Sequence, residues 1–377
     1  MFSLKRRTLA SRRLTVSPKT VGPIGVDLAY GKLYMVQLQR DSQKQISLLA
    51  CCHIDYDISR DELLESPVVF KSLIKAALKK GPFHGREVVA ALPSTDVRIL
   101  PIAYQKSPQG DAKSIIDQLQ QRIDGSLDDY VIDYRLLRSN PSDEENLALV
   151  VMAKREKVIS YLQIYEQAGL RPKALDVGPT AIQRLISAIP TTKQETVLVI
   201  NTARTKSYLT IVSGQRLLLD QEIQFSEFQV LNKLAEALDI DYSMAEELIR
   251  KNGLINDRKS NSGTLSLDIN DVSVVIHEIC KPQFLKLVES INRLLVFSAS
   301  ETRGVPVSRV YLLGAVGRWK GSDLLLRSML NIEVAPIREE DDFYACFPIV
   351  KGKSVNGIVP EMVKATGYAL RGLVGDA

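Results

Sequence analysis

The chain contains two similar groups of predicted strands, one near its N-terminus and one near its middle. Each group has three apolar runs, and a short polar turn follows the first run. The runs are Ile24–Leu28, Leu33–Leu38, Ile46–Cys52, Thr196–Asn201, Ser207–Ser213 and Arg216–Gln224. Three closely spaced runs predict an antiparallel meander. A meander at the start of each half predicts an α/β protein with two similar lobes and a cleft between them.

The segments around the meanders predict how the lobes are divided. A helix and a strand after the first meander complete a first lobe at residues 22–96. The order β-α-β-β-α-β at residues 97–177 predicts a small α+β subdomain inserted into this lobe. A helix and a linker at residues 178–195 lead to a second lobe at residues 196–377 with a helical insertion, in which Pro282 should kink or split a long helix. In one alternative, the final helix returns to the first lobe.

The charge of the chain is concentrated at its start. Residues 1–21 contain six basic residues and no acidic one, and removing these six from the 49 basic residues leaves 43 against 44 acidic ones. A near-neutral body argues against a nucleic-acid-binding surface. We expect the basic tail to be disordered, to contact anionic lipid head groups, or to act as an organellar targeting sequence.

Metal and nucleophile chemistry have no support in the residue pattern. The four cysteines have no zinc-ligand spacing, and the three histidines lie far apart with no partner nucleophile. No apolar stretch approaches the roughly 18 residues of a membrane span. We therefore expect no metal site, no catalytic triad and no spanning helix.

Three runs resemble the nucleotide-binding turns of actin-like ATPases, whose fold is ribonuclease H-like. They are the two phosphate hairpins Ile24–Ala29 and Val199–Ala203 and the adenosine-side turn Leu312–Gly317. Four further segments resemble the PilM family of type IV pilus assembly proteins, whose fold is related to that of the division protein FtsA. They are Val89–Pro93, Val150–Gln183, Ala245–Leu248 and Gly367–Gly372. The resemblance implies an actin-like two-lobed fold with an inserted subdomain.

The phosphate hairpins depart from the family pattern. Asp27 is retained, but Ala29 stands at a glycine position and Tyr34 at a lysine position. In the second hairpin Asn201 replaces an aspartate and Ala203 replaces a glycine. Glycine lets backbone N–H groups approach phosphate oxygens, and an amide cannot supply the charge that helps to hold Mg²⁺. These changes predict poor ATP hydrolysis.

The third turn keeps Gly314 and Gly317, with Ala315 in place of a second glycine. The resemblance makes the candidate nucleotide-contacting positions Asp27, Ala29, Asn201, Ala203, Gly314 and Gly317. Either the turns persist only because the fold needs them, or nucleotide still binds with little hydrolysis, or the protein is an active ATPase. We expect a pseudo-ATPase with no catalytic residue, for which ATP and magnesium are possible ligands but are not required.

The resemblance also implies a function. A PilM-like protein is a cytoplasmic scaffold, peripheral to the inner membrane, in a type IV pilus or related secretion system. It binds the N-terminal peptide of a PilN-like single-pass membrane protein in a groove between the first lobe and the inserted subdomain, and it contacts other assembly-platform proteins. The alternatives are an ATP-binding switch, a small-molecule kinase and a filament-forming protein of the same fold.

Overall fold

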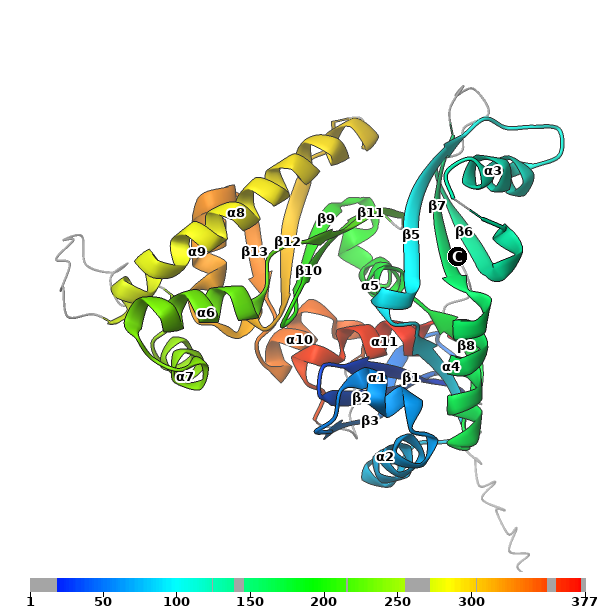
Figure 1. Ribbon diagram of the computed structural model, residues 1–377, viewed down its shortest axis with the longest axis horizontal. Helices are drawn as coiled ribbons and strands as arrows, with labels where there is room; N and C mark the ends of the chain where they lie inside the picture. The colour runs from blue at the N-terminus through cyan, green and yellow to red at the C-terminus, as the bar shows by residue number, and fades with distance from the viewer. Residues whose placement is uncertain are drawn as a thin grey trace, which may run out of the picture.

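The structure is a computed structural model that describes residues 19–123, 125–138, 146–214, 216–254, 272–302, 304–350 and 357–373. Almost all of the basic tail predicted at residues 1–21 therefore lies outside the described residues. Figure 1 shows a first sheet at the bottom, a second sheet with its helices at the left, and a third, smaller sheet at the right. None of the helices in the described part of the chain is long and apolar enough to cross a membrane.

The first sheet has the strand order β3-β2-β1-β4-β8. Its strands are β1 (Thr20–Ala29), β2 (Lys32–Arg40), β3 (Ile46–Asp55), β4 (Glu87–Ala91) and β8 (Arg171–Asp176). Side chains alternate along β2 with the strand period of two. Leu33 and Met35 pack with α2 (Pro67–Lys80) and α4 (Arg155–Gln167), whereas Val36 and Leu38 pack on the opposite face. Both faces of the sheet are therefore covered.

One strand lies outside its predicted subdomain. The sequence pattern placed β8 with residues 97–177, but β8 pairs in parallel with β4 and extends the first sheet. The preceding helix α4 packs against β8 and α2, and its Tyr165 is part of the first-lobe core. A helical crossover is the usual way to bring a strand parallel to another strand. The boundary at residue 177 is therefore wrong for α4 and β8, which belong structurally to the first lobe.

The inserted subdomain consists of a three-stranded sheet of order β5-β7-β6 and one helix. The elements are β5 (Val97–Tyr104), β6 (Tyr130–Arg138), β7 (Asn146–Lys154) and α3 (Asp111–Gln120). Apolar side chains of α3 and of one sheet face form a separate small core. On the other face, Ile99 and Leu149 pack in a small cluster with Leu217 of the second lobe.

The second sheet repeats the topology of the first, with the order β11-β10-β9-β12-β13. Its strands are β9 (Thr196–Thr202), β10 (Ser207–Ser213), β11 (Arg216–Ile223), β12 (Val307–Gly314) and β13 (Glu333–Pro336). In each lobe an antiparallel meander is followed by two parallel strands. The duplication predicted from the sequence is therefore a duplication of topology.

The remaining helices cover the sheets and join the lobes. They are α1 (Arg60–Glu65), α5 (Gly178–Ser187), α6 (Glu227–Leu238), α7 (Tyr242–Asn252), α8 (Val272–Glu301), α9 (Ser322–Leu330), α10 (Glu340–Cys346) and α11 (Val363–Leu370). Single 3-10 turns occur at Ser94–Asp96, Leu127–Asp129, Pro190–Gln194, Val316–Arg318, Pro348–Val350 and Pro360–Met362. α8 runs through Pro282 as one helix, with Cys280 and Phe284 buried on either side, so the predicted split is absent.

The final helix α11 packs against β1 and α5 in the first lobe. Two glycines make this close approach possible. A Cβ on Gly25 would lie 2.0 Å from the carbonyl oxygen of Ala365, and a Cβ on Gly367 would lie 2.2 Å from that of Ala181. Buried residues from both lobes, including Val36, Val197 and Leu370, form one cluster. The two lobes therefore share a core.

Candidate functional site

The structure brings two of the six predicted positions into one cavity. Asp27 lies near the end of β1 and Asn201 near the end of β9, and both line a cavity of about 260 Å³ between the lobes. β1 and β9 hold equivalent places in the two sheets, which explains why these two side chains meet. Ala29, Ala203, Gly314 and Gly317 are not among the residues that line this cavity.

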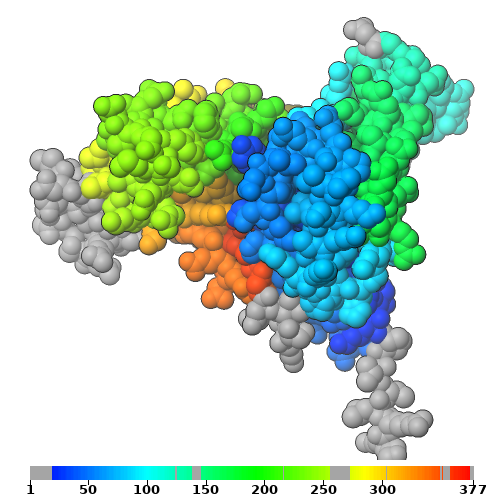
Figure 2. All heavy atoms as spheres, turned by 60° about the horizontal axis from the view of Figure 1, so that its bottom comes forward, coloured from blue at the N-terminus to red at the C-terminus, as the bar shows by residue number. Residues whose placement is uncertain are grey.

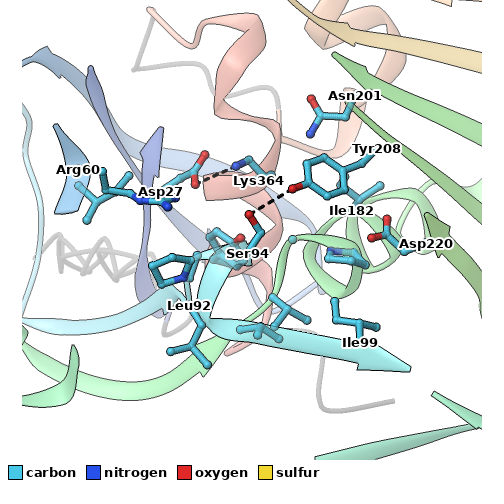
Figure 3. Close-up of a pocket in the computed structure, with 18 of the residues that line it drawn as sticks. Asp27, Arg60, Leu92, Ser94, Ile99, Ile182, Asn201, Tyr208, Asp220 and Lys364 are labelled. Atoms are coloured by element: carbon cyan, nitrogen blue, oxygen red, sulfur yellow. Dashed lines mark hydrogen bonds and ion pairs between the residues drawn. The ribbon is translucent and has the colours of Figure 1, made fainter. Parts of the chain in front are cut away.

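Asp27 is paired with a lysine that the sequence analysis did not single out. The Asp27 side chain is 2% exposed, and its Oδ1 lies 3.1 Å from Nζ of Lys364. Lys364 is the second residue of α11, where the positive end of a helix normally disfavours a cation. The nearby carboxylate offsets that cost, and the ammonium neutralises the charge of Asp27 (Figure 3). Oδ2 of Asp27 has no hydrogen-bond partner among the described residues.

A cation lies between the tips of the two hairpins. The guanidinium of Arg204 is 4.9 Å from the ring centroid of Tyr30 and 5.6 Å from that of Tyr242. Tyr30 belongs to the turn after β1, and Arg204 to the turn after β9. Figure 2 shows dark-blue atoms of the N-terminal hairpin against the green atoms of the second lobe. Cation–π contacts of Arg204 therefore join the turn after β1 to the second lobe.

The turn after β12 is built for contact with β9. Gly314 has φ +80°, and a Cβ there would lie 1.8 Å from the carbonyl oxygen of Thr202. The Thr202 hydroxyl donates to the carbonyl of Leu313 at 2.8 Å and accepts from the N–H of Val316 at 3.0 Å. The N–H of Ala315 donates to the Thr202 carbonyl at 3.2 Å. The close approach to Thr202 therefore explains why residue 314 is glycine. The N–H groups of Ala315 and Val316 are both used in hydrogen bonds within the protein.

A larger groove lies between the inserted sheet and the first lobe, with a volume of about 820 Å³. One wall is formed by Asp133, Tyr134 and Arg135 of β6, and another by the consecutive residues 173–177 of β8 and its end. Successive strand residues point to opposite faces, so consecutive lining residues mean that the groove follows strand edges. β6 and β8 are both the last strands of their sheets. The groove therefore runs between two strand edges that no described strand covers.

The remaining walls of the groove are apolar along most of their length and charged at one end. The apolar side chains come from β7, α4 and β8, and they are Leu149, Val151, Ala153, Val158, Leu162, Ala174 and Leu175. At the charged end Asp176 is 3.1 Å from Arg184 and 3.5 Å from Arg371. Arg135 donates to Gln183 at 2.7 Å. These contacts hold the arginines in fixed positions.

The sequence matches the family model of the type IV pilus assembly protein PilM over residues 25–373. The chain belongs to the PilM family. It matches no curated protein.

Solved structures show the fold of this PilM-family chain. A chain of the PilM–PilN type IV pilus biogenesis complex is 21% identical, with a TM-score of 0.70, over 93% of this chain and 98% of that one. The ethanolamine utilization protein EutJ from Carboxydothermus hydrogenoformans is 12% identical, with a TM-score of 0.50, over 94% of this chain and 91% of that one. The predicted α/β, actin-like two-lobed fold is confirmed.

Sequence reasoning missed the side chains that surround the predicted positions in this PilM-family protein. Lys364 lies far from Asp27 in sequence, and its only signal was a charged residue within an apolar helix. Arg204 was visible as the residue after Ala203, but its aromatic partners lie in other elements. The six predicted positions stay a prediction for nucleotide contact.

Proposed function

We propose that this protein is a scaffold in the inner-membrane assembly platform of a type IV pilus or related secretion system. In this proposal it binds the cytoplasmic N-terminal peptide of a PilN-like single-pass membrane protein. The observation that carries the proposal is the groove between the edges of β6 and β8. The similarity of the whole chain to a chain of the PilM–PilN complex supports the choice of partner.

The groove has the properties of a site for an extended peptide. An uncovered strand edge offers backbone N–H and C=O groups to an added strand, and alternate side chains then enter pockets. The wall at residues 173–177 is about 16 Å long at the usual rise of a strand, so it spans about five peptide residues. Apolar walls suit aliphatic side chains such as leucine. The peptide would tie the scaffold to the inner-membrane surface from the cytoplasmic side.

We also propose that the cleft does not support efficient ATP hydrolysis. Phosphoryl transfer depends on positioned cations and backbone donors around the phosphates. Here Lys364 neutralises Asp27, and Asn201 supplies no charge. Arg204 is held against the rings of Tyr30 and Tyr242. This arrangement favours a pseudo-ATPase over the ATP-binding switch.

The first experiment is fluorescence anisotropy with a labelled N-terminal peptide of the PilN-like partner. Val151→Glu places a charge on the apolar wall of the groove, and Val296→Glu is the control because Val296 is 75% exposed on α8. We expect Val151→Glu to weaken binding by at least about tenfold, since an unpaired charge would be buried. Circular dichroism checks that both variants are folded. Equal affinities for wild type and Val151→Glu would reject the groove as the peptide site.

A thermal melt with Mg-ATP separates the scaffold from the nucleotide switch. A bound nucleotide stabilises a protein by about 2.7 kcal/mol at a hundredfold excess over its dissociation constant. We expect no shift at millimolar Mg-ATP. A clear shift would make the switch the better account of the cleft.

A further inference from the structure

The helix α2 carries a line of lysines on the side that faces away from the protein core. Lys71, Lys75 and Lys79 are four residues apart, so their side chains are neighbours on one face of the helix. All three are exposed, whereas Phe70 and Ile74 of the same helix are buried in the core of the first lobe. Figure 1 shows α2 at the outer, lower edge of the first lobe. The lysine line is therefore open to a partner.

Neither ion pairing nor the helix dipole explains this line of lysines. α2 contains no acidic residue, and among the described residues no carboxylate forms an ion pair with any of the three lysines. Like charges four residues apart on a helix repel one another. Lys79 lies in the last turn, where the helix dipole favours a cation, but Lys71 and Lys75 lie before that turn. An external anion would relieve the repulsion along the whole line.

Further exposed cations follow the C-terminal end of α2. Arg86 precedes β4 and Arg171 begins β8, and the N–H of Arg171 donates to the carbonyl of Arg86 at 2.8 Å. Both arginine side chains are exposed. The neighbouring carboxylate of Glu87 is 3.2 Å from Nζ of Lys173, so its charge is paired. The acidic residues of α1 precede the opposite, N-terminal end of α2, so positive charge increases toward the C-terminal end.

The first strand of the protein begins beside the C-terminal end of α2. The amide nitrogen of Gln37 donates to the carbonyl of Gly22 at 2.9 Å, and its amide oxygen accepts from the N–H of His84 at 2.8 Å. Gly22 lies near the start of β1, and His84 lies four residues after the end of α2. The sequence that leads into β1, residues 1–18, contains five basic residues and no acidic residue. Basic sequence therefore joins the first lobe at this point.

We propose that this protein binds anionic lipid head groups, such as phosphatidylglycerol, directly through a basic surface of the first lobe. The basic surface consists of Lys71, Lys75, Lys79, Arg86 and Arg171. Lysine and arginine side chains close to a negatively charged membrane are attracted to it, and several of them together give a peripheral attachment. The attachment would orient the first lobe toward the membrane.

Two observations favour a membrane over a nucleic acid as the anionic partner. The exposed face of α2 offers no aromatic side chain on which a base could stack, and Val68 on this face is 82% exposed. The β8 wall of the peptide groove begins at Lys173, two residues after Arg171, so a peptide that leaves the groove at this end leads toward the basic surface. The second observation rests on the proposed function, in which the peptide belongs to a membrane protein.

The test is cosedimentation of the full chain with phosphatidylcholine vesicles that contain about one third phosphatidylglycerol, at about 0.15 M salt. The α2 variant combines Lys71→Gln, Lys75→Gln and Lys79→Gln. Each basic residue near an anionic membrane strengthens binding by about fivefold, so the α2 variant should bind at least about tenfold more weakly than wild type. Vesicles of phosphatidylcholine alone should bind neither protein. Circular dichroism checks that the variant is folded.

The control variant removes the same number of charges from the second lobe. It combines three substitutions of exposed lysines on α6, α7 and α8, namely Lys233→Gln, Lys251→Gln and Lys286→Gln. We expect the control variant to bind the vesicles as wild type does. The comparison separates an effect of the basic surface from an effect of net charge.

Three results would overturn the proposal. The first is no binding of wild type to the phosphatidylglycerol vesicles, and the second is an equal loss of binding, or no loss, in the α2 and control variants. The third is binding of a DNA duplex of about 20 base pairs that is lost in the α2 variant while vesicle binding is kept, which would assign the surface to nucleic acid. None of the three α2 lysines lines the peptide groove, so the α2 variant should bind the PilN-like peptide with wild-type affinity. Lipid binding and peptide binding can therefore fail separately.

Discussion

The partly buried carboxylate of Asp220 leads to the prediction that Asp220→Asn stabilises the protein above neutral pH. Burial raises its pKa to about 6, and its hydrogen bond from Thr210 only partly opposes that effect. A folded-state pKa above the unfolded value of about 3.9 means that ionisation favours unfolding. The penalty is absent at low pH, grows as pH rises from about 4 to about 6, and is constant above that.

The size of the effect follows from the two pKa values. One pKa unit corresponds to about 1.4 kcal/mol, so the full penalty at pH 8 is about 3 kcal/mol. At pH 4.5 about 1 kcal/mol of it is present, since the unfolded carboxyl has begun to ionise. Asp220→Asn removes the titration. The stability gained by this variant should therefore be larger at pH 8 than at pH 4.5 by about 2 kcal/mol.

Urea denaturation of wild type and Asp220→Asn at the two pH values measures this difference. The difference between the proteins is the quantity to use, because other carboxylates change the stability of both with pH. Asp117→Asn on α3 is the control variant, since the exposed ion pair of Asp117 with Lys113 should contribute little at either pH. A gain that is the same at pH 4.5 and pH 8 would refute the raised pKa of Asp220.

Two further predictions concern the turns of the cleft. Gly314→Ala should lower the free energy of unfolding by at least about 3 kcal/mol, because its Cβ would overlap the carbonyl of Thr202. Gly85→Ala should lower it by only about 1 kcal/mol, because Gly85 has φ +75° but no atom lies within 4 Å of the added Cβ. Thermal melts compare the two, and equal costs would show that the overlap does not matter. Arg204→Ala and Tyr30→Ala should be coupled by about 0.5–1 kcal/mol in a double-mutant cycle of stability, whereas strict additivity would mean that the pair contributes nothing.

The arrangement of the sheets was predictable where local signals were strong. Alternating apolar residues separated by turns gave the two meanders, because hairpin pairing is decided by nearby residues. The place of β8 was not predictable in the same way. A parallel strand is joined to its neighbour through a distant crossover, and here the whole inserted subdomain lies between β4 and β8. The short helix α1 was missed although Ser59 and Glu62 form a capping box at its start.

The candidate site was predictable only in part. Asp27 and Asn201 could be paired because they lie near the ends of equivalent strands in a duplicated topology. Lys364 could not be paired with Asp27, since the position of α11 over β1 depends on glycine contacts made by the folded chain. The groove was expected between the first lobe and residues 97–177, but its walls depend on β8 forming the edge of the first sheet. Whether a strand lies at the edge of a sheet depends on how all the strands assemble, so the local sequence of the strand does not show it.

Hydrogen exchange of the full chain with and without the PilN-like peptide tests the central claim most directly. An added strand protects the backbone amides with which it pairs. The scaffold account predicts slower exchange at residues 131–135 of β6 or residues 173–177 of β8, where the groove runs. Unchanged exchange at both edges, with protection confined to the turns at residues 29–32 and 203–206, would place the peptide in the interlobe cleft and contradict the account.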